Sequence, residues 1–510
     1  MIKKINRILK QNSKKLLISL LLFAGFILVR LSSILTIPFF QDEADYIYFA
    51  IQAMSQKGMG FISLSQGVKP MHTWLMIPFL MHIKDPVIGA RLLSMTAGLF
   101  SMVGIYLLSC ELFAKKKIGV IAAIIFILFP YAQVYNSLAV LESTVSVFII
   151  FSIYFLVKLF RNPSLANMYA YGIVTGLGLL TKRQAFFNIY LIPLFFFILP
   201  QKIRLNSRLI KLLSLLVFAV VIAYVMQLIL KNSEFYERIA WFEGGNIYTK
   251  KAWILLPFQM KIHIFHTNIL NTILFTLSYL TFPYVALLMY GIAKARKNMK
   301  GMIILLSFFL LPILTICIFG RWVGERWLFP TSLPIIPLIA YGLYTFTENF
   351  SKKKFFDLKK NVREICMYAL FFAYPSYFIL STVFFPLNSP MTINEKSQYF
   401  MCPTTFFERE AYYFKVLARK DKIIIGTQNE LGFVNIMRID LKDEKNITIN
   451  GYFPKKNKLP NELVATTSAK VFYATYLGPN DEIKDQRALK IKEERNLKSL
   501  CTYRLYEIVR

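Results

Sequence analysis

Long apolar stretches alternate with short polar segments over the first three quarters of the chain. A transmembrane helix needs about 20 mainly apolar residues to cross a bilayer. The apolar segment 73–83 is too short for this and predicts a helix that lies at the membrane interface. We expect a polytopic α-helical membrane protein with about eleven transmembrane helices, at residues 16–38, 87–113, 118–136, 141–160, 165–181, 184–200, 209–230, 264–290, 301–320, 327–348 and 365–386.

The pattern changes after residue 386. Residues 421–427, 470–474 and 502–508 have the short apolar or alternating runs of strands, and residues 405–420 have a helical pattern. We therefore divide the chain into a transmembrane domain, 1–386, and a small soluble α/β domain, 387–510, which is long enough to hold its own core. Cys402 and Cys501 could form a disulfide if this second domain is extracytoplasmic, but nothing in the sequence shows that they approach each other.

The composition agrees with a membrane protein. Of the 510 residues, 56% are hydrophobic and 17% are charged, whereas soluble domains have about a quarter of their residues charged. The net charge of +32 by itself would suit a nucleic-acid-binding protein. However, residues 1–386 hold 39 Lys and Arg against 13 Asp and Glu, in short runs between apolar stretches. That distribution is typical of cytoplasmic membrane loops and argues against a nucleic-acid partner.

The basic residues also predict the orientation in the cell membrane. If the N-terminus is cytoplasmic, the inner loops hold 25 Lys and Arg and the outer loops hold 12. Short cytoplasmic loops are enriched in these residues, so we favour this orientation. An odd number of spans then places the C-terminal domain outside the cytoplasm.

Three carboxylates follow the first predicted span. Asp42, Glu43 and Asp45 lie within four residues, at the start of a helical segment. Acidic residues in the first turn of a helix are favourable because of the helix dipole, which is a purely structural interpretation. The alternative is catalytic, because neighbouring carboxylates repel each other and one of them can then accept a proton from a substrate.

Charged residues occur at further points of the same predicted face. Lys69 precedes the interfacial helix, Lys182 lies between two short spans, and Arg326 begins a late span. Each cation fits ordinary contact with lipid headgroups, and each also fits the binding of a lipid-linked phosphate. Glu142 begins the fourth predicted span, where an acid that favours the helix dipole is again the structural alternative.

No local motif supports nucleotide or metal chemistry. The sequence has no G-x-G-x-x-G that opens a βαβ unit, no Walker loop, no H-E-x-x-H and no G-x-S-x-G. The four histidines form no convincing set of metal ligands. No cofactor is indicated, although a divalent cation remains an open alternative.

Several of these segments together resemble the family 39 glycosyltransferases of the GT-C superfamily, which include protein O-mannosyltransferases and lipid A aminoarabinose transferases. The most specific match is the Asp42-Glu43-Ala44-x-Tyr46 segment, followed by Lys69-Pro70. The segment 90–94 around Arg91, the glycine-rich segment 176–182 and the segment 325–330 are supporting matches. The resemblance covers about residues 20–345, and the C-terminal region resembles extracytoplasmic domains of some bacterial members.

The resemblance implies an inverting transfer of a hexose or pentose on the outer face of the membrane. The donor would be a polyprenyl-phosphate sugar, and the acceptor a hydroxyl group of a protein, lipid or glycan. The outer loop 39–85 would carry the active site, with Asp42 as the general base and Glu43 as its partner. The residues implied to bind substrate are Lys69, Lys182, Arg326, Arg91 and Glu142, and no metal ligand is implied.

A transporter or flippase of lipid-linked sugars is the main alternative. Transporters tend to carry ionisable residues near the middle of the bilayer and to contain repeated, broken helices. Here the acids gather at one face and no internal repeat is evident, so we favour the enzyme. An inactive scaffold with a binding domain is a third alternative, and the intact Asp42 and Lys69 argue against it.

Overall fold

The fold is taken from a computed structural model. It describes residues 2–161, 164–190, 250–295, 299–321, 323–352, 360–392, 405–419, 421–428, 431–441, 444–452, 469–477, 486–495 and 502–508, with shorter pieces at 192, 214, 218–219, 221–226, 228–231, 459 and 483. Cys402 and Cys501 lie outside the described residues, so their predicted pairing stays a prediction. Cys110, Cys317 and Cys366 are free thiols.

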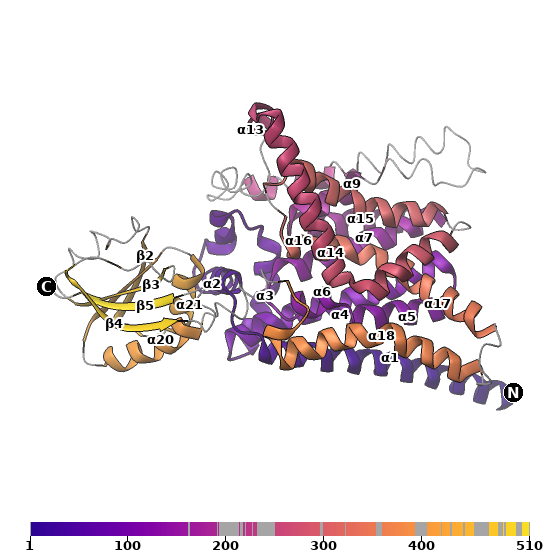
Figure 1. Cartoon of the computed structure of the whole chain (residues 1–510), viewed down its shortest axis with the longest axis horizontal. Helices are drawn as coiled ribbons and strands as arrows, with labels where there is room; N and C mark the ends of the chain where they lie inside the picture. Colours follow the sequence, from indigo (N-terminus) through magenta and orange to yellow (C-terminus); the bar gives the residue numbers. More distant parts are fainter. Residues whose placement is uncertain are drawn as a thin grey trace.

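A helical bundle makes up most of the molecule, with a β-sheet domain at one end and the N-terminus at the other (Figure 1). This confirms a polytopic helical protein with a small C-terminal domain. The helices of the bundle are α1 (Ile2–Thr36), α2 (Gln41–Ser55), η1 (Met59–Gln66), α3 (Pro70–His82), α4 (Pro86–Phe113), α5 (Lys116–Ile127), α6 (Pro130–Tyr135), α7 (Leu141–Arg161), α8 (Leu165–Leu179), η2 (Arg183–Ala185), α9 (Phe186–Tyr190), α13 (Lys250–Leu255), α14 (Phe258–Lys294), α15 (Met299–Phe319), α16 (Glu325–Ser332), η4 (Leu333–Ile335), α17 (Ile336–Lys352), α18 (Lys360–Phe384) and η5 (Pro386–Asn388).

Seven helical segments in the described part of the chain are long and apolar enough to cross a membrane. Each overlaps one of the eleven predicted stretches. They are 16–36, 86–113, 141–159, 258–294, 299–319, 325–350 and 361–384. The stretches 184–200 and 209–230 lie largely outside the described residues.

The predicted span 118–136 is not a single helix. It is divided between α5 and α6, because the helix ends at Leu128 and Pro130 begins a new one. A proline in the first turn is well placed to start a helix, since it needs no amide hydrogen there. α8 is also short, with 15 residues. Neither α5 nor α8 alone reaches the length of a full span.

Two glycines bring α14 and α17 into backbone contact inside the bundle. A Cβ atom at Gly291 would collide with the carbonyl oxygen of Leu338, and one at Gly342 would collide with the carbonyl oxygen of Leu287. α17 continues from α16 through η4, so one nearly continuous run leads from this contact to Arg326. The glycine contact therefore fixes the base of the segment that carries Arg326.

The C-terminal domain is a five-stranded mixed sheet with two helices. Its elements are α20 (Thr405–Leu417), β1 (Ile423–Gln428), α21 (Leu431–Asp440), β2 (Ile447–Tyr452), β3 (Lys470–Leu477), β4 (Ala488–Arg495) and β5 (Thr502–Ile508). The strand order is β2-β1-β3-β5-β4; β1 is parallel to β2 and β3, and β5 is antiparallel to β3 and β4. The predicted helix and three predicted strands are found, whereas α21, β2 and β4 were not predicted.

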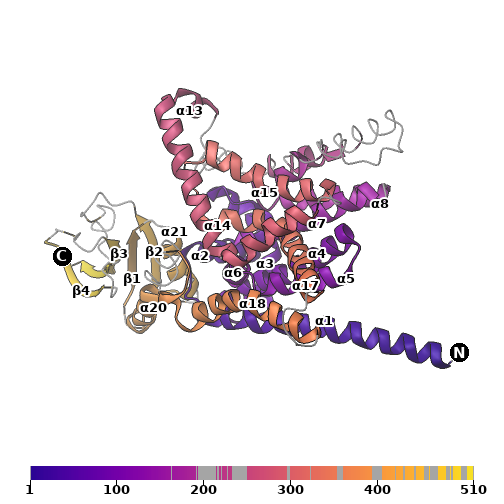
Figure 2. The same ribbon diagram turned by 45° about the vertical axis from the view of Figure 1, so that its right-hand side comes forward.

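The helices of this domain cover one face of the sheet. Phe414 of α20 and Ile436 of α21 pack in one core with Phe472 and Leu505 of the sheet. α21 also packs on α2, and both views show the domain seated at that end of the bundle (Figure 2). The C-terminal domain therefore contacts the helix that carries the predicted catalytic acids.

Candidate active site

Four charged side chains meet at the end of the bundle nearest the C-terminal domain. Asp42, Glu142 and Arg326 are each the second residue of a helix, namely of α2, α7 and α16. Lys182 lies in the turn between α8 and η2. Three helix N-termini, with their partial positive charge, thus point toward one place.

The four side chains form one chain of ion pairs. Arg326 Nη1 pairs with Asp42 Oδ2, and Arg326 Nε lies 3.6 Å from Glu142 Oε1. Lys182 Nζ donates to the same Glu142 oxygen over 2.6 Å. The side chains of Asp42 and Arg326 are 30% and 27% exposed, whereas Glu142 is buried. Asp42 and Arg326 are therefore accessible to a substrate. The buried carboxylate of Glu142 contacts both cations, Lys182 and Arg326.

Burial changes the proton affinity of groups around this cluster. It lowers the pKa of Lys182, while the neighbouring Glu142 carboxylate acts in the opposite direction. It raises the pKa of the Tyr46 hydroxyl well above its ordinary value, and the negative charge of Asp42 adds to the rise. Tyr46 lies one turn after Asp42 on α2, so it presents a protonated hydroxyl group at the edge of the cluster.

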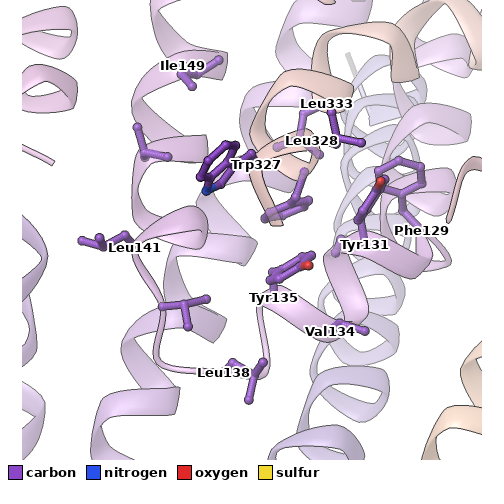
Figure 3. Packing of buried hydrophobic residues seen from close by; sticks show 14 of the residues in the cluster. Phe129, Tyr131, Val134, Tyr135, Leu138, Leu141, Ile149, Trp327, Leu328 and Leu333 are labelled. Carbon is purple, nitrogen blue, oxygen red and sulfur yellow. The ribbon is translucent and has the colours of Figure 1, made fainter. Parts of the chain in front are cut away.

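Aromatic packing holds α16, and hence Arg326, in place. Trp327 and Leu328 lie beside Tyr135 and residues of α7 (Figure 3). The ring of Tyr135 stacks on that of Phe329 with 5.4 Å between centroids. Gln184 Nε2 donates to the Trp327 carbonyl over 2.7 Å, which ties the segment after Lys182 to α16. The segments that carry Lys182 and Arg326 are therefore linked to each other.

Lys69 lies beside the turn that carries Lys182. Its Nζ donates to the Leu179 carbonyl over 2.8 Å and lies 5.5 Å from the centre of the Phe186 ring. The backbone N–H of Met71 donates to Leu180 over 3.1 Å, which anchors the start of α3 at the same turn. The structure thus brings Lys69 to the border of the site.

Glu43 and Arg91 form a separate, buried pair. Arg91 donates through Nε and Nη2 to the two carboxylate oxygens of Glu43, over 2.8 and 2.7 Å. Its other three N–H groups donate to the carbonyls of residues 34, 37 and 38. Glu43 also accepts from the backbone of Phe40 and Ala139. All five donors of Arg91 are in use, and both side chains are buried.

His72 and Tyr46 also belong to this region, and neither was among the predicted site residues. His72 is buried, its Nδ1 lies 2.8 Å from Thr144 Oγ1, and its ring meets that of Tyr46 edge-on at 5.5 Å. Burial lowers the pKa of His72 to about 4, so the ring is neutral near pH 7. The spacing of four residues between Asp42 and Tyr46 puts both on one helix face, which was the available signal for Tyr46.

The described residues contain no group of three or more His, Cys, Asp or Glu side chains placed to hold a metal ion. A divalent cation, which the sequence leaves open, therefore has no ready set of protein ligands among these residues.

Comparison with known proteins supports the resemblance read from the motifs. Residues 67–226 match the family described as dolichyl-phosphate-mannose-protein mannosyltransferase. No curated protein matches the chain by sequence. The crystal structure of apo ArnT from Cupriavidus metallidurans is similar, with a TM-score of 0.55, 11% identity, and coverage of 97% of this chain and 98% of ArnT. ArnT bound to undecaprenyl phosphate gives a TM-score of 0.55 and 11% identity over 96% of this chain and 97% of that one.

A third similar structure is the arabinofuranosyltransferase AftD from Mycobacteria. Its TM-score is 0.50 at 11% identity, and the match covers 96% of this chain and 41% of AftD. At such low identity these structures establish a shared fold. The chain therefore has an ArnT-like fold, and its residues 67–226 are similar to the family described as dolichyl-phosphate-mannose-protein mannosyltransferase.

Proposed function

We propose that this enzyme moves a hexose or pentose from a polyprenyl-phosphate sugar to an acceptor hydroxyl group, with inversion at the sugar carbon. The observation that carries the proposal is the accessible Asp42–Arg326 pair, backed by Lys182 and Glu142. It offers a carboxylate and two cations at one place. The relative bound to undecaprenyl phosphate favours a polyprenyl-phosphate donor.

Asp42 is the general base in this proposal. The acceptor oxygen attacks the anomeric carbon of the sugar and Asp42 takes the hydroxyl proton. The bond between that carbon and the phosphate oxygen breaks, and its electron pair leaves with the polyprenyl phosphate. One displacement of this kind inverts the configuration.

Arg326, Lys182 and Lys69 bind the donor phosphate. Negative charge grows on the phosphate as the bond to the sugar breaks, so fixed cations stabilise the transition state more than the ground state. The N-termini of α2, α7 and α16 add partial positive charge. Glu142 fixes the directions of Lys182 and Arg326 from its buried position.

The ion pair also gives an order of events. The guanidinium of Arg326 is paired with Asp42 Oδ2. A phosphate competes for the same guanidinium, because phosphate binds arginine well. Donor binding thereby leaves a carboxylate oxygen of Asp42 free to accept the proton of the second substrate.

Glu43 and Arg91 act through the backbone rather than on the substrate. Their buried pair joins the end of α1, the start of α2 and α4. We therefore assign the predicted catalytic partner Glu43 and the predicted binding residue Arg91 as positioning residues of the outer loop 39–85.

The proposed site faces the outside of the cell. We infer about eleven crossings, an odd number, of which seven are the long helices found in the described residues. The N-terminus and the sheet domain lie at opposite ends of the bundle, which fits a cytoplasmic N-terminus and an extracytoplasmic domain from about residue 387 (Figure 1). The excess of basic residues in the predicted inner loops supports the same orientation.

Cysteine labelling tests this orientation. In a protein whose native Cys366, Cys402 and Cys501 are replaced by serine, Lys445→Cys places an exposed thiol in the C-terminal domain, and Lys116→Cys places one at the opposite end. An impermeant maleimide on intact cells should label the first variant and leave the second unlabelled. Labelling of Lys445→Cys only after permeabilisation would reverse the orientation.

Incubation of membranes with labelled polyprenyl-phosphate sugars tests the reaction itself. Transfer of label to a protein, lipid or glycan, lost in Asp42→Asn, is expected. Movement of the intact labelled lipid between leaflets, with no label in any acceptor, would favour the transporter alternative instead.

A further inference from the structure

The helix that carries Asp42 is covered by the C-terminal domain at defined contacts. Asn435 Nδ2 of α21 donates to Asp45 Oδ1 of α2 over 2.8 Å. Arg438, one turn later on α21, lies over the ring of Tyr48 with 5.3 Å between its Cζ atom and the ring centroid. Two residues of α21 thus contact two residues of α2 that lie within two turns of Asp42.

These contacts are anchored on the side of the C-terminal domain. Asn435 is buried, and a buried amide without a partner is costly, so its bond to Asp45 is needed where the domain is docked. Arg438 Nη2 donates to the Ile449 carbonyl over 3.3 Å, which ties it to β2. Arg438 therefore links the sheet to α2.

The other anchor of α2 lies at its beginning. The buried pair of Glu43 with Arg91 fixes the first turn. α2 also packs against α3 and η1 within the bundle. The contacts of Asp45 and Tyr48 with α21 add a hold from the C-terminal domain, and together these contacts define the direction in which Asp42 points.

We propose that Asn435 and Arg438 are positioning residues, through which the C-terminal domain holds α2 so that Asp42 faces Arg326. This inference rests on the proposed function and deepens it. It gives the C-terminal domain a part in catalysis in addition to any contact with the acceptor.

The electrostatics of Asp45 support the coupling. Burial raises the pKa of Asp45 to about 7, the bond from Asn435 acts in the opposite direction, and the charge of Asp42 adds to the rise. The carboxyl of Asp45 is therefore sensitive to the group that faces it. A second carboxyl at position 435 would oppose it directly.

An exchange of the two side chains tests the proposal. At pH 8, above the pKa of Asp45, Asn435→Asp places carboxylate against carboxylate, and we expect the kcat of sugar transfer to fall about tenfold with the KM for the donor unchanged. The double variant Asp45→Asn with Asn435→Asp again pairs an amide with a carboxylate, and should recover to within about threefold of the wild-type kcat. Arg438→Met should also lower kcat, and Arg438→Lys should lower it less.

Lys422→Glu is the matched control, since Lys422 is an exposed residue of the same domain. It should leave kcat and KM unchanged. A wild-type kcat in Asn435→Asp, or no recovery in the double variant, would overturn the positioning role. A rise in the donor KM in place of the fall in kcat would also overturn it, because that result indicates a contact with the donor.

Hydrogen exchange of residues 41–55 tests the same coupling without any activity. Protection of α2 should fall in Asn435→Asp and return in the double variant. If no polyprenyl-phosphate sugar is a substrate, the proposed function fails, and the exchange measurement still decides the coupling. Equal protection of α2 in all variants would disprove it.

Discussion

Two adjacent carboxylates of α2 have opposite surroundings. Asp42 is partly exposed and pairs with Arg326, which is also within reach of Glu142. Glu43 is fully buried, and its oxygens accept from Arg91 and from two backbone N–H groups. Consecutive residues of a helix point about 100° apart, so a single step along the chain separates an accessible position from a buried one.

The two ion pairs also differ in what a ligand can change. The Asp42–Arg326 pair is open to solvent, so a phosphate can bind Arg326 in place of Asp42. In the Glu43–Arg91 pair, every N–H donor of Arg91 is already in use. A ligand that displaced one of the two residues would leave the other as an unpaired buried charge. An ion pair can therefore be part of the chemistry or part of the framework, and its accessibility decides which.

The largest expected effect is on catalysis at Asp42. Asp42→Asn keeps the shape of the side chain and removes the proposed base, so transfer should fall by about 10²–10⁴-fold while the protein stays folded. Asp421→Asn, which alters a partly exposed acid of the C-terminal domain paired with Lys470, is the control and should keep full activity. Transfer rates of matched membrane preparations check this, and full activity of Asp42→Asn would remove this residue from the mechanism.

The next effect is on stability at Glu43. Glu43→Gln leaves the buried guanidinium of Arg91 without a matching charge, and we expect a loss of about 3–5 kcal/mol. Glu364→Gln breaks the exposed pair of Glu364 with Lys117 and should cost at most about 1 kcal/mol. Thermal unfolding in detergent measures both. Similar unfolding temperatures for the two variants would contradict the difference drawn between open and buried pairs.

A smaller effect is expected at Lys69. If it binds the donor phosphate, Lys69→Met should lower the transfer rate about tenfold and raise the donor KM, and Lys69→Arg should restore part of both. The exposed Lys84 lies in the same predicted outer loop, and Lys84→Met should have no effect. Rates measured against donor concentration decide this. Unchanged kinetics in Lys69→Met would assign the phosphate to Lys182 and Arg326 alone.

The smallest effect is a pH dependence at Asp45. Burial raises the pKa of Asp45 from 3.8 to about 7, so folding favours its protonated form. The stability gained is complete below about pH 4 and is lost as the pH rises through 7. The groups described as facing Asp45 are Asp42 on its own helix and Asn435 on α21, with Arg438 beside Asn435.

Asp45→Asn imitates the protonated carboxyl, so its advantage in Tm over the wild type should grow between pH 5 and pH 7 to roughly 2–4 °C. Thermal unfolding at several pH values gives the answer. A constant difference across this range would mean that Asp45 does not titrate there.

Much of the bundle follows from the sequence because a helix in lipid needs only length and apolar character. Seven predicted stretches coincide with long apolar helices. The division of 118–136 depends on Pro130, which a count of apolar residues does not register. Strands β2 and β4 lie at the two edges of the sheet, where alternation is weaker because less of the strand is buried.

The site could be predicted as a set of residue types but not as a set of contacts. Asp42, Glu142, Lys182 and Arg326 each stood out as a charge near a membrane helix, and the structure brings all four together. Pairing across 284 residues, as between Asp42 and Arg326, has no local signal. The docking of α21 on α2 has none either, since it depends on the relative placement of two domains.

The glycine contact between α14 and α17 has a consequence for genetics. Arg326 lies on the order of 20 Å along the α16–α17 run from Gly342. A small tilt of this run at the contact therefore produces a larger displacement of the guanidinium. Any other residue at Gly291 or Gly342 must push the two helices apart. Loss-of-function alleles should therefore collect at these two codons as well as at the charged ones, and suppressors should arise on the facing helix rather than beside the substrate.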